Sequence, residues 1–444
     1  MQATIEAAVV AHNAGRLQEA EASYREILAR EPKHPAALNN LGMIALTAGH
    51  LGDAVRLIGQ AFANAPDDPG LHPSARALGL ALFHQGFRID ARPWLERAAQ
   101  AAPDDAEVAA ALERSVLPAH CAPSVADPSG GPAWRRYPPY ESANYVYSID
   151  IVGTCNLRCP TCPVENMRDE PRPKGLMSVE LFRSIIDKIR AEAPGASPEI
   201  WLFNWGEPLL HPKLAEIVAL VRERGMSVHL STNLNIRRGL ESAVRAAPDS
   251  IKVSMSGLSS TGTYGQTHAG GDVNLVKSNL HLLRYLLDRH RVATRVWVGF
   301  HLYRSNLQEA AVVRALCDEL RFEYRENPAV LHPVEKVVEF IEGRARPEDV
   351  ATVDRLLTHP LAILEQVKAK RTGHFDCELR FNMTTINHDG TVALCCATYG
   401  TESQLGVRFL DEPHEALEAR KYAHPFCATC YGHGLQYTTA KLPD

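Results

Sequence analysis

The sequence has no excess of basic residues and no long apolar run, and these absences exclude two classes of partner. Its 444 residues include 47 Lys and Arg against 52 Asp and Glu, a net charge of −5. Bulk electrostatics therefore predicts no nucleic-acid partner. No run of about 18 apolar residues occurs, so we expect no membrane-spanning helix. The first residues lack the basic and apolar regions of a signal peptide, and we expect a cytoplasmic protein.

The cysteines gather in two places rather than scattering along the chain. Of the ten, three lie between residues 155 and 162 and five lie between 377 and 430. Cys121 and Cys317 stand alone, and we expect them to behave as small apolar residues. Because disulfides are rare in the cytoplasm, the two groups indicate metal ligands or catalytic groups.

A repeat of about 34 residues occupies the N-terminal part of the chain. Its positions are Gly15, Ala20, Tyr24, Ile27 and Pro32, then Gly49, Ala54, Ile58, Ala61 and Pro66, then Gly86, Ala91, Leu95, Ala98 and Pro103. Small residues let two helices cross closely, and the proline ends the second helix. The pattern resembles the tetratricopeptide repeat. The resemblance implies an all-α solenoid over residues 1–116, closed by a capping helix at about 106–116.

The resemblance also implies a groove for a peptide or protein partner on the repeats. A purely structural or dimerising role, and a plain helical bundle, stay open as alternatives. Residues 117–143 are rich in Pro, Ser and Gly and are predicted to be a linker.

After the linker, strand and helix patterns alternate. The predicted strands are 145–152, 199–204, 226–232, 249–256, 293–300 and 321–326. Such a series implies a parallel sheet with helices outside it. We predict an α/β fold, a partial TIM-like (β/α)6 barrel over residues 144–330, followed by a helical connection over 331–374. In such barrels function concentrates at the carboxyl ends of the strands.

Three cysteines, Cys155, Cys159 and Cys162, occupy the loop after the first predicted strand. A structural zinc site takes four ligands, and disulfides take an even number. An odd triad therefore indicates a metal centre with an open position. Three thiolates can bind three irons of a [4Fe–4S] cluster and leave the fourth for an external ligand. A zinc knuckle is the alternative, although no fourth ligand follows at zinc spacing.

The C-x-x-x-C-x-x-C spacing and the sequence CNLRCPTCP resemble the signature of the radical S-adenosylmethionine (SAM) superfamily. Thr161 stands where many members have an aromatic residue. The resemblance implies a [4Fe–4S] cluster that cleaves SAM to methionine and a 5′-deoxyadenosyl radical, which removes hydrogen from a substrate. It also implies an electron donor such as flavodoxin or ferredoxin.

Further residues resemble the family's SAM-binding positions. Gly206, Glu207 and Pro208 match its Gly-Gly-Glu-Pro motif, with Trp205 in place of the first glycine. Glycine allows close approach of the backbone to a ligand. Glu207 is expected to accept from the SAM amino group or to brace the loop.

The ends of the next strands supply the other predicted SAM contacts. They are Asn233, Ser254 and His268, with Ser256 in place of the family's usual aspartate. His268 stands where an arginine holds the SAM carboxylate, and it could do so only when protonated. Arg295 and Arg304 are alternatives for that role. Asn233 can equally form a turn, and Ser254 and His268 can be structural.

The remaining cysteines form a second pattern. Cys377, Gly390 and Cys395 make a C-x12-G-x4-C unit, followed by Cys427 and Cys430 in a C-x-x-C pair. Asp389-Gly390 predicts a hairpin. The pattern resembles the SPASM and twitch extensions of radical SAM enzymes, and the radical SAM dehydrogenase of butirosin biosynthesis.

The resemblance implies a small α+β domain over 375–444 with an auxiliary [4Fe–4S] cluster. Its implied ligands are Cys377, Cys395, Cys427 and Cys430. Cys396 is a spare or replaces Cys395, and four thiolates would also suit zinc. A thioredoxin-like role for the C-x-x-C pair is disfavoured because no βαβ pattern surrounds it.

Together the resemblances imply oxidative modification of a peptide or protein, with the auxiliary cluster as electron acceptor. One alternative is dehydrogenation of a small carbohydrate-like metabolite. Another is a non-catalytic adaptor that carries the repeats.

Overall fold

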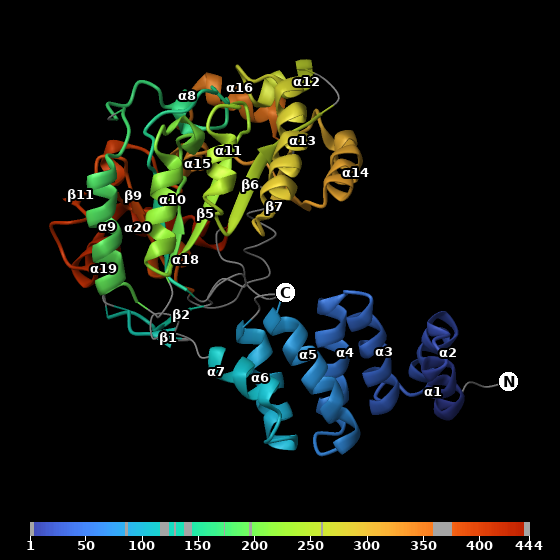
Figure 1. The fold of residues 1–444 in the computed structure, drawn as a ribbon. Coiled ribbons are helices and arrows are strands. Elements are labelled where there is room, and N and C mark those ends of the chain that lie inside the picture. Colours follow the sequence, from blue (N-terminus) through green and yellow to red (C-terminus); the bar gives the residue numbers. More distant parts are fainter. Residues whose placement is uncertain are drawn as a thin grey trace. The chain divides into compact units, whose positions relative to one another are not determined.

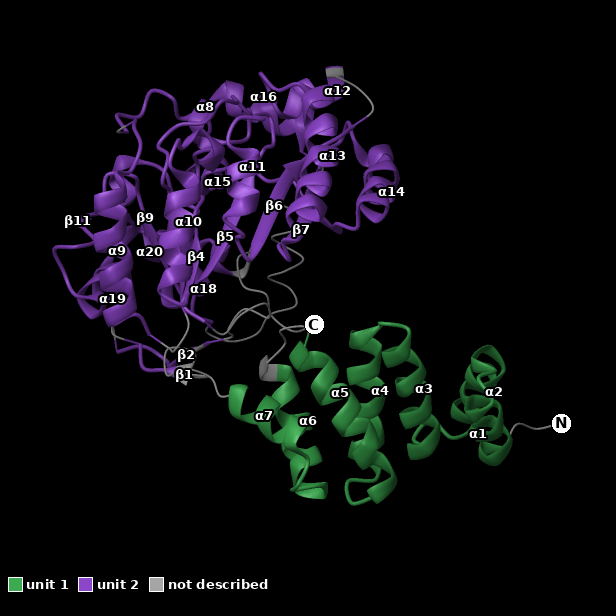
Figure 2. Ribbon diagram, viewed as in Figure 1, with its two compact units in different colours: residues 1–117, 138–143 green, residues 118–137, 144–444 purple. Residues whose placement is uncertain are grey.

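The computed structural model describes most of the chain in two compact units. The described residues are 4–84, 88–115, 124–127, 130–136, 144–172, 174–194, 198–258, 261–357 and 375–438. One unit comprises residues 1–117 and 138–143, and the other comprises 118–137 and 144–444 (Figure 2). Cys121 and the end of the predicted helical connection, 358–374, lie outside the described residues. Among the described helices, none combines the length and apolar character needed to cross a bilayer.

The first unit consists of paired helices, which confirms the predicted tetratricopeptide pattern. They are α1 (Ile5–Asn13), α2 (Leu17–Arg30), α3 (Pro35–Thr47), α4 (Leu51–Asn64), α5 (His72–His84), α6 (Arg88–Ala101) and α7 (Ala106–Arg114), with the short η1 (Pro69–Leu71) before α5. A Cβ on Gly42 would lie 2.7 Å from Ile58 Cγ1, and one on Gly79 would lie 3.0 Å from the Leu95 backbone nitrogen. These glycines therefore let paired helices cross closely, and α7 lies where the capping helix is predicted.

The second unit is built on one nine-stranded sheet, in which the six predicted strands are parallel and in chain order. Figure 1 shows β5, β6 and β7 side by side in this sheet. They are β3 (Val146–Ile149), β4 (Glu199–Trp201), β5 (Ser227–Thr232), β6 (Ser250–Met255), β7 (Arg295–Leu302) and β8 (Glu323–Pro328). The helices that follow them are α9 (Val179–Glu192), α10 (Leu214–Glu223), α11 (Leu240–Arg245), α13 (Val273–His290) and α14 (Ala310–Leu320). This partly open α/β sheet confirms the predicted fold class.

Alternating side chains separate the two faces of this sheet. Val228, Leu230 and Val253 are buried in the core with apolar residues of the helices. Their neighbours Lys252 and Ser254 point to the opposite face and are half-buried. We call this second face the inner face.

The C-terminal segment continues the same sheet. β9 (Met383–Ile386) pairs in parallel with β3, and β10 (Thr391–Ala393) and β11 (Gln404–Arg408) add antiparallel strands beyond it. The hairpin predicted at Asp389-Gly390 is present, and Gly390 has a φ of 86°. The predicted α+β segment is therefore an extension of the barrel sheet, and the strand pairing crosses the boundary predicted at residue 375.

Shorter elements complete the second unit. They are β1 (Ser124–Val125), β2 (Trp134–Arg135), α8 (Pro163–Asn166), η3 (Pro208–Leu210), α12 (Thr261–Thr267), η4 (Leu307–Glu309), α15 (Val334–Ile341), α16 (Pro347–Leu356), α18 (Glu378–Phe381), η5 (Thr401–Ser403), α19 (His414–Ala423), α20 (Pro425–Gly432) and η6 (Leu435–Thr438). β1 and β2 pair within the predicted linker. Trp134 is buried there, and Arg136 Nε donates to Asp376 Oδ2 at 2.8 Å. This part of the linker is thus anchored to the C-terminal segment.

Candidate metal centre

The cysteine triad lies in the loop that leaves the carboxyl end of β3. Cys155, Cys159 and Cys162 are half-buried and free of disulfides. Cys155 Sγ accepts from the Leu157 backbone N–H at 3.4 Å and from Asn233 Nδ2 at 3.5 Å. Within the described residues no three His, Cys, Asp or Glu side chains converge on a single-ion site. A [4Fe–4S] cluster does not require this convergence, because each thiolate binds a different iron.

The electrostatics of the triad fit a cationic occupant. Burial raises the pKa of Cys155 to about 11 and that of Cys162 to about 12. The pKa of Cys159 is raised by burial and further by Cys162 and Cys155. Thiolates at these positions need positive charge nearby, which iron would supply. The donor set and its two N–H···S contacts therefore fit an iron–sulfur cluster.

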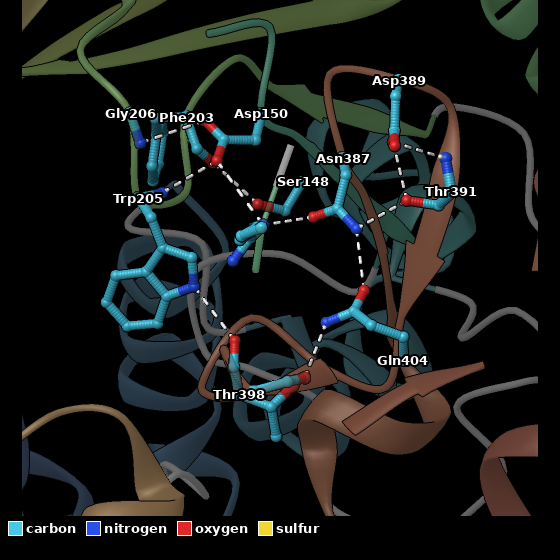
Figure 3. A network of polar contacts seen from close by, with 12 residues as sticks. Ser148, Asp150, Phe203, Trp205, Gly206, Asn387, Asp389, Thr391, Thr398 and Gln404 are labelled. Atoms are coloured by element: carbon cyan, nitrogen blue, oxygen red, sulfur yellow. Dashed lines mark hydrogen bonds and ion pairs between the residues drawn. The ribbon is translucent and has the colours of Figure 1, made fainter. Parts of the chain in front are cut away.

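The loop after β4 is held close to the triad by two buried carboxylates. Asp150 Oδ1 accepts from Gly206 N–H at 3.1 Å, and its Oδ2 accepts from Trp205 N–H at 3.3 Å (Figure 3). Glu207 accepts from the backbone N–H groups of Leu209 at 3.1 Å and Asn233 at 2.8 Å. Burial raises the pKa of Glu207 to about 7. Glu207 thus braces the loops after β4 and β5 against each other.

Gly206 cannot carry a side chain in this arrangement. A Cβ there would lie 1.7 Å from the Val152 carbonyl oxygen and 2.9 Å from Asp150 Oδ1. The glycine therefore allows the loop after β4 to touch the strand end that leads into the triad.

Asp150 is a residue of the site that sequence reasoning missed. It is buried, and burial raises its pKa to about 6 although Arg172 lies 4.0 Å from Oδ2. Arg172 also donates to Asn387 Oδ1, on the C-terminal segment. The available signal was an acidic residue at the end of a predicted strand, five positions before the first cysteine of the triad.

Trp205 joins the loop after β4 to the loop that carries Cys395 and Cys396. Its indole Nε1–H donates to the Thr398 carbonyl oxygen at 3.0 Å (Figure 3). Its ring lies edge-on to His332 and Tyr399, with centroids 5.5 Å and 6.2 Å away. The departure from the family's glycine therefore has a structural reason in this chain.

The structure places Asn233 against the triad loop and His268 in a buried pair. Asn233 Nδ2 donates to Asn156 Oδ1 at 2.9 Å. His268 Nδ1 lies 2.6 Å from Ser256 Oγ, and its ring stacks on Tyr264 at 4.8 Å. Burial lowers the pKa of His268 to about 4, so the ring is neutral at pH 7. Burial therefore disfavours the protonated form of His268 that this role requires.

The two alternative arginines, Arg295 and Arg304, interact with other groups of the protein. Arg295 begins β7, at the end of the sheet opposite to the cysteine loop, and pairs with Glu323 at 3.4 Å. Arg304 Nε donates to the Leu357 carbonyl oxygen at 2.6 Å. Ser254 lies half-buried on the inner face.

The C-terminal cysteines also lie together. Burial raises the pKa of Cys395, and Cys396, Cys377 and Cys430 raise it further. The pKa of Cys430 is raised by burial and then by Cys377 and Cys427. Besides burial, the groups that raise the pKa of Cys396 are Cys377 and Glu378. Cys430 thus interacts electrostatically with the three other predicted ligands, Cys377, Cys395 and Cys427, and Cys396 interacts with Cys377.

Comparison with known proteins identifies two families. Residues 149–311 match the family model of the radical SAM superfamily, and residues 11–78 match that of the tetratricopeptide repeat.

Two curated relatives match short parts of the chain. The tungsten-containing aldehyde ferredoxin oxidoreductase cofactor-modifying protein of Pyrococcus furiosus is 36% identical over 89 residues, 20% of this chain and 23% of the relative. The 7,8-dihydro-6-hydroxymethylpterin dimethyltransferase of Methanocaldococcus jannaschii is 32% identical over 101 residues, 22% of this chain and 18% of the relative. The chain thus spans about a fifth of the length of these relatives.

Two solved structures are similar to this chain at low identity. SuiB of Streptococcus suis bound to SAM superposes with a TM-score of 0.46 and 11% identity, covering 80% of this chain and 83% of SuiB. The enzyme anSMEcpe with bound SAM gives 0.43 and 16%, covering 63% and 82%. The family models thus assign a radical SAM domain to the barrel and tetratricopeptide repeats to the helices ahead of it.

Proposed function

We propose that this enzyme oxidises a peptide or protein, with a SAM-binding cluster at Cys155, Cys159 and Cys162 and an auxiliary cluster at the C-terminal cysteines. The observation that carries the proposal is the hydrogen bond from Trp205 to Thr398, which joins the loop after β4, itself held to the end of β3 by Asp150, to the loop that carries Cys395 and Cys396. When bound, the first cluster supplies one electron for cleavage of SAM to methionine and a hydrogen-abstracting 5′-deoxyadenosyl radical, and the second can accept the electron that the oxidised substrate loses.

The residues around the triad orient these groups. Gly206 lets the backbone of the loop after β4 pack directly against the Val152 carbonyl, where no side chain fits. Asp150 and Glu207 hold the backbone of the flanking loops through four N–H···O contacts. Asn233 donates to the Cys155 sulfur, which favours its thiolate form. We propose Asn233, Ser254, Ser256 and neutral His268 as the polar lining of the SAM site.

The repeat unit supports a polypeptide partner. A cavity of about 420 Å³ lies between α2, α3 and α4, with Arg25, Ile44 and Arg56 in its lining. Repeat solenoids present such surfaces to peptides and proteins. We also propose an external one-electron donor such as flavodoxin or ferredoxin.

A second candidate is oxidation of a small molecule, such as a carbohydrate-like metabolite, with the repeats recruiting another protein. The names of the two curated relatives, a cofactor-modifying protein and a pterin dimethyltransferase, favour it. The matched regions are short, however, at 89 and 101 residues. An adaptor without chemistry is disfavoured by the intact triad.

The first test is the metal content of the anaerobically reconstituted protein beside a variant with Cys155, Cys159 and Cys162 all changed to Ala. We expect about eight irons in the parent and about four in the variant. 5′-Deoxyadenosine should form under reductant with the parent alone. About four irons in the parent, none in the variant and zinc elsewhere would exclude the auxiliary electron acceptor.

The substrate class can be tested with extracts of cells grown in deuterated medium. Because the radical takes hydrogen from the substrate, deuterium enters 5′-deoxyadenosine when the extract fraction contains that substrate. Transfer from the peptide and protein fraction supports the main proposal. Transfer from the metabolite fraction alone supports the second candidate.

A further inference from the structure

A buried arginine lies three residues after the first of the C-terminal cysteines. Arg380 belongs to α18, the short helix that begins directly after Cys377. Its guanidinium donates from Nε at 2.9 Å and from Nη2 at 2.7 Å to Oδ1 of Asp376, which is also buried. Because a guanidinium stays protonated in proteins, this side chain brings a permanent positive charge to the cysteine group.

Three aromatic rings hold the Arg380 guanidinium in place. Its central carbon lies 4.0 Å from the centroid of the Tyr422 ring, 4.6 Å from that of Tyr431 and 4.9 Å from that of Trp134. The rings come from α19, α20 and β2. Aromatic faces attract a cation without neutralising it. The charge is therefore fixed in position by three separate segments of the chain.

Tyr431 connects this cation to the cysteines. It follows Cys430 in α20, and its hydroxyl accepts from the Cys377 backbone N–H at 2.5 Å. The same hydroxyl donates to Asp376 Oδ1 at 3.2 Å. Two cysteines that are distant in the sequence are thus joined through one side chain, and the ring of that side chain contacts Arg380.

The charge of Arg380 acts on two of the predicted ligands. Burial raises the pKa of Cys427, and Arg380 opposes this increase. Burial, Cys377 and Cys427 raise the pKa of Cys430, and Arg380 again acts in the opposite direction. A cation that stabilises a thiolate also stabilises the electron added to a thiolate-bound cluster, because negative charge increases in both cases.

We infer that Arg380 raises the reduction potential of the proposed auxiliary cluster, so that the cluster accepts an electron more readily. The inference rests on the proposed function, because it requires a cluster at the C-terminal cysteines. The donor set fits one, since four thiolates that interact with one another are available, at Cys377, Cys395, Cys427 and Cys430. Net charge near such a cluster is one of the factors that set its potential.

The sign of the effect can be tested with substitutions that change one charge each. Arg380→Met removes a positive charge, whereas Arg380→Lys keeps it. Asp376→Asn removes a negative charge beside the same cysteine group and preserves the shape of the side chain. We expect the first and third changes to shift the potential in opposite directions. A general loosening of the site would not produce this opposition.

The experiment is a redox titration of the anaerobically reconstituted full chain, followed by electron paramagnetic resonance. The background variant has Cys155, Cys159 and Cys162 changed to Ala, so that the signal of the first cluster does not interfere. Arg420→Met is the matched control, because Arg420 lies on α19 with a side chain that is 46% exposed and pairs with Glu412. Its charge is screened by solvent.

In Arg380→Met we expect a more negative potential than in the background. At a fixed solution potential the ratio of reduced to oxidised cluster should fall about 10-fold, which corresponds to about 59 mV for one electron. Asp376→Asn should shift the potential in the positive direction. Arg380→Lys should stay close to the background, and Arg420→Met should match it.

Two results would overturn the inference. One is the same potential in Arg380→Met as in the Arg420→Met control, and the other is a shift of the same sign in Arg380→Met and Asp376→Asn. The iron content of the background variant, measured first, separates these results from failure of the proposed function. Absence of iron there, or zinc in its place, would refute the auxiliary cluster itself and the inference with it.

Discussion

Replacing Trp205 should loosen the loop that carries Cys395 and Cys396. Two substitutions separate its contributions. Trp205→Phe keeps a ring against His332 and Tyr399 but removes the N–H that bonds the Thr398 carbonyl. Trp205→Gly restores the residue that many radical SAM enzymes have, and removes both the ring and the N–H.

The expected magnitudes follow from these contacts. One hydrogen bond contributes about 1 kcal/mol, and leaving the carbonyl partly unsatisfied can add about 1 kcal/mol more. Each edge-on aromatic contact contributes about 0.5–1.5 kcal/mol. We therefore expect a loss of about 1–2 kcal/mol in the free energy of unfolding for Trp205→Phe. For Trp205→Gly we expect about 3–5 kcal/mol, the range for removing a large aromatic side chain.

Hydrogen exchange gives the local readout. The backbone N–H groups of residues 395–400 should exchange faster in Trp205→Phe, and faster again in Trp205→Gly. Trp201→Phe is the matched control, because its indole donates to Glu199 on its own strand at 3.3 Å. Unchanged exchange over residues 395–400 in Trp205→Gly, or an equal effect in the Trp201 control, would refute the coupling of the two loops.

Three further predictions concern single residues. Gly206→Ala places a Cβ 1.7 Å from the Val152 carbonyl oxygen, so the loop must move. SAM affinity, measured by equilibrium dialysis, should fall at least about 10-fold. Unchanged affinity would show that this loop is not needed for SAM binding. Burial raises the pKa of Asp150 to about 6, above its unfolded value near 4, so its ionisation should lower stability as pH rises from about 4 to about 6. Denaturant titrations of the iron-free chain should show a smaller loss over this range in Asp150→Asn than in the parent, because Glu207 still titrates in both, and parallel pH profiles would contradict it. Asp376 is buried and pairs with Arg136 and Arg380, so Asp376→Ala should cost about 3–5 kcal/mol in the free energy of unfolding; a loss below about 1 kcal/mol in the same titrations would show that the pairs are not structural.

Local patterns in the sequence were sufficient for the main elements of this fold, although β1 and β2 lie where a linker was predicted. Runs of strand-forming residues predicted the six parallel strands, and the repeated small residues predicted the helix pairs. The Asp389-Gly390 hairpin followed from turn chemistry alone. These features depend on neighbours within a few residues, so the sequence displays them directly.

Pairing between distant segments could not be predicted in this way. β9 pairs with β3 although Met383 and Val146 are far apart in the chain, and the local sequence of neither strand indicates which strand it pairs with. The neutral state of His268 has the same origin. Its pKa depends on burial among residues from several elements, whereas the motif suggested only a substitute for arginine.

Two residues outside the family's motifs have structural roles that a motif match does not reveal. Trp205 differs from the first glycine of the family's Gly-Gly-Glu-Pro motif. In the structure it joins the loop after β4 to the loop that carries Cys395 and Cys396. Asp150 matched no motif, yet it accepts both backbone N–H groups of the Trp205-Gly206 turn. Both residues therefore lie near the place where the barrel meets its C-terminal extension.

The position of β9 gives this extension a structural role besides metal binding. Without it, β3 would be an exposed edge of a parallel sheet, with unpaired N–H and C=O groups beside the cysteine loop. β9 pairs with all four residues of β3, and Tyr145 and Tyr147 bond to Thr384 and His414 of the C-terminal segment. The strand that leads into the triad is thus held by the segment that carries the second cysteine group. Loss of the C-terminal segment would therefore disturb the loop of Cys155, Cys159 and Cys162 as well as remove the proposed auxiliary site.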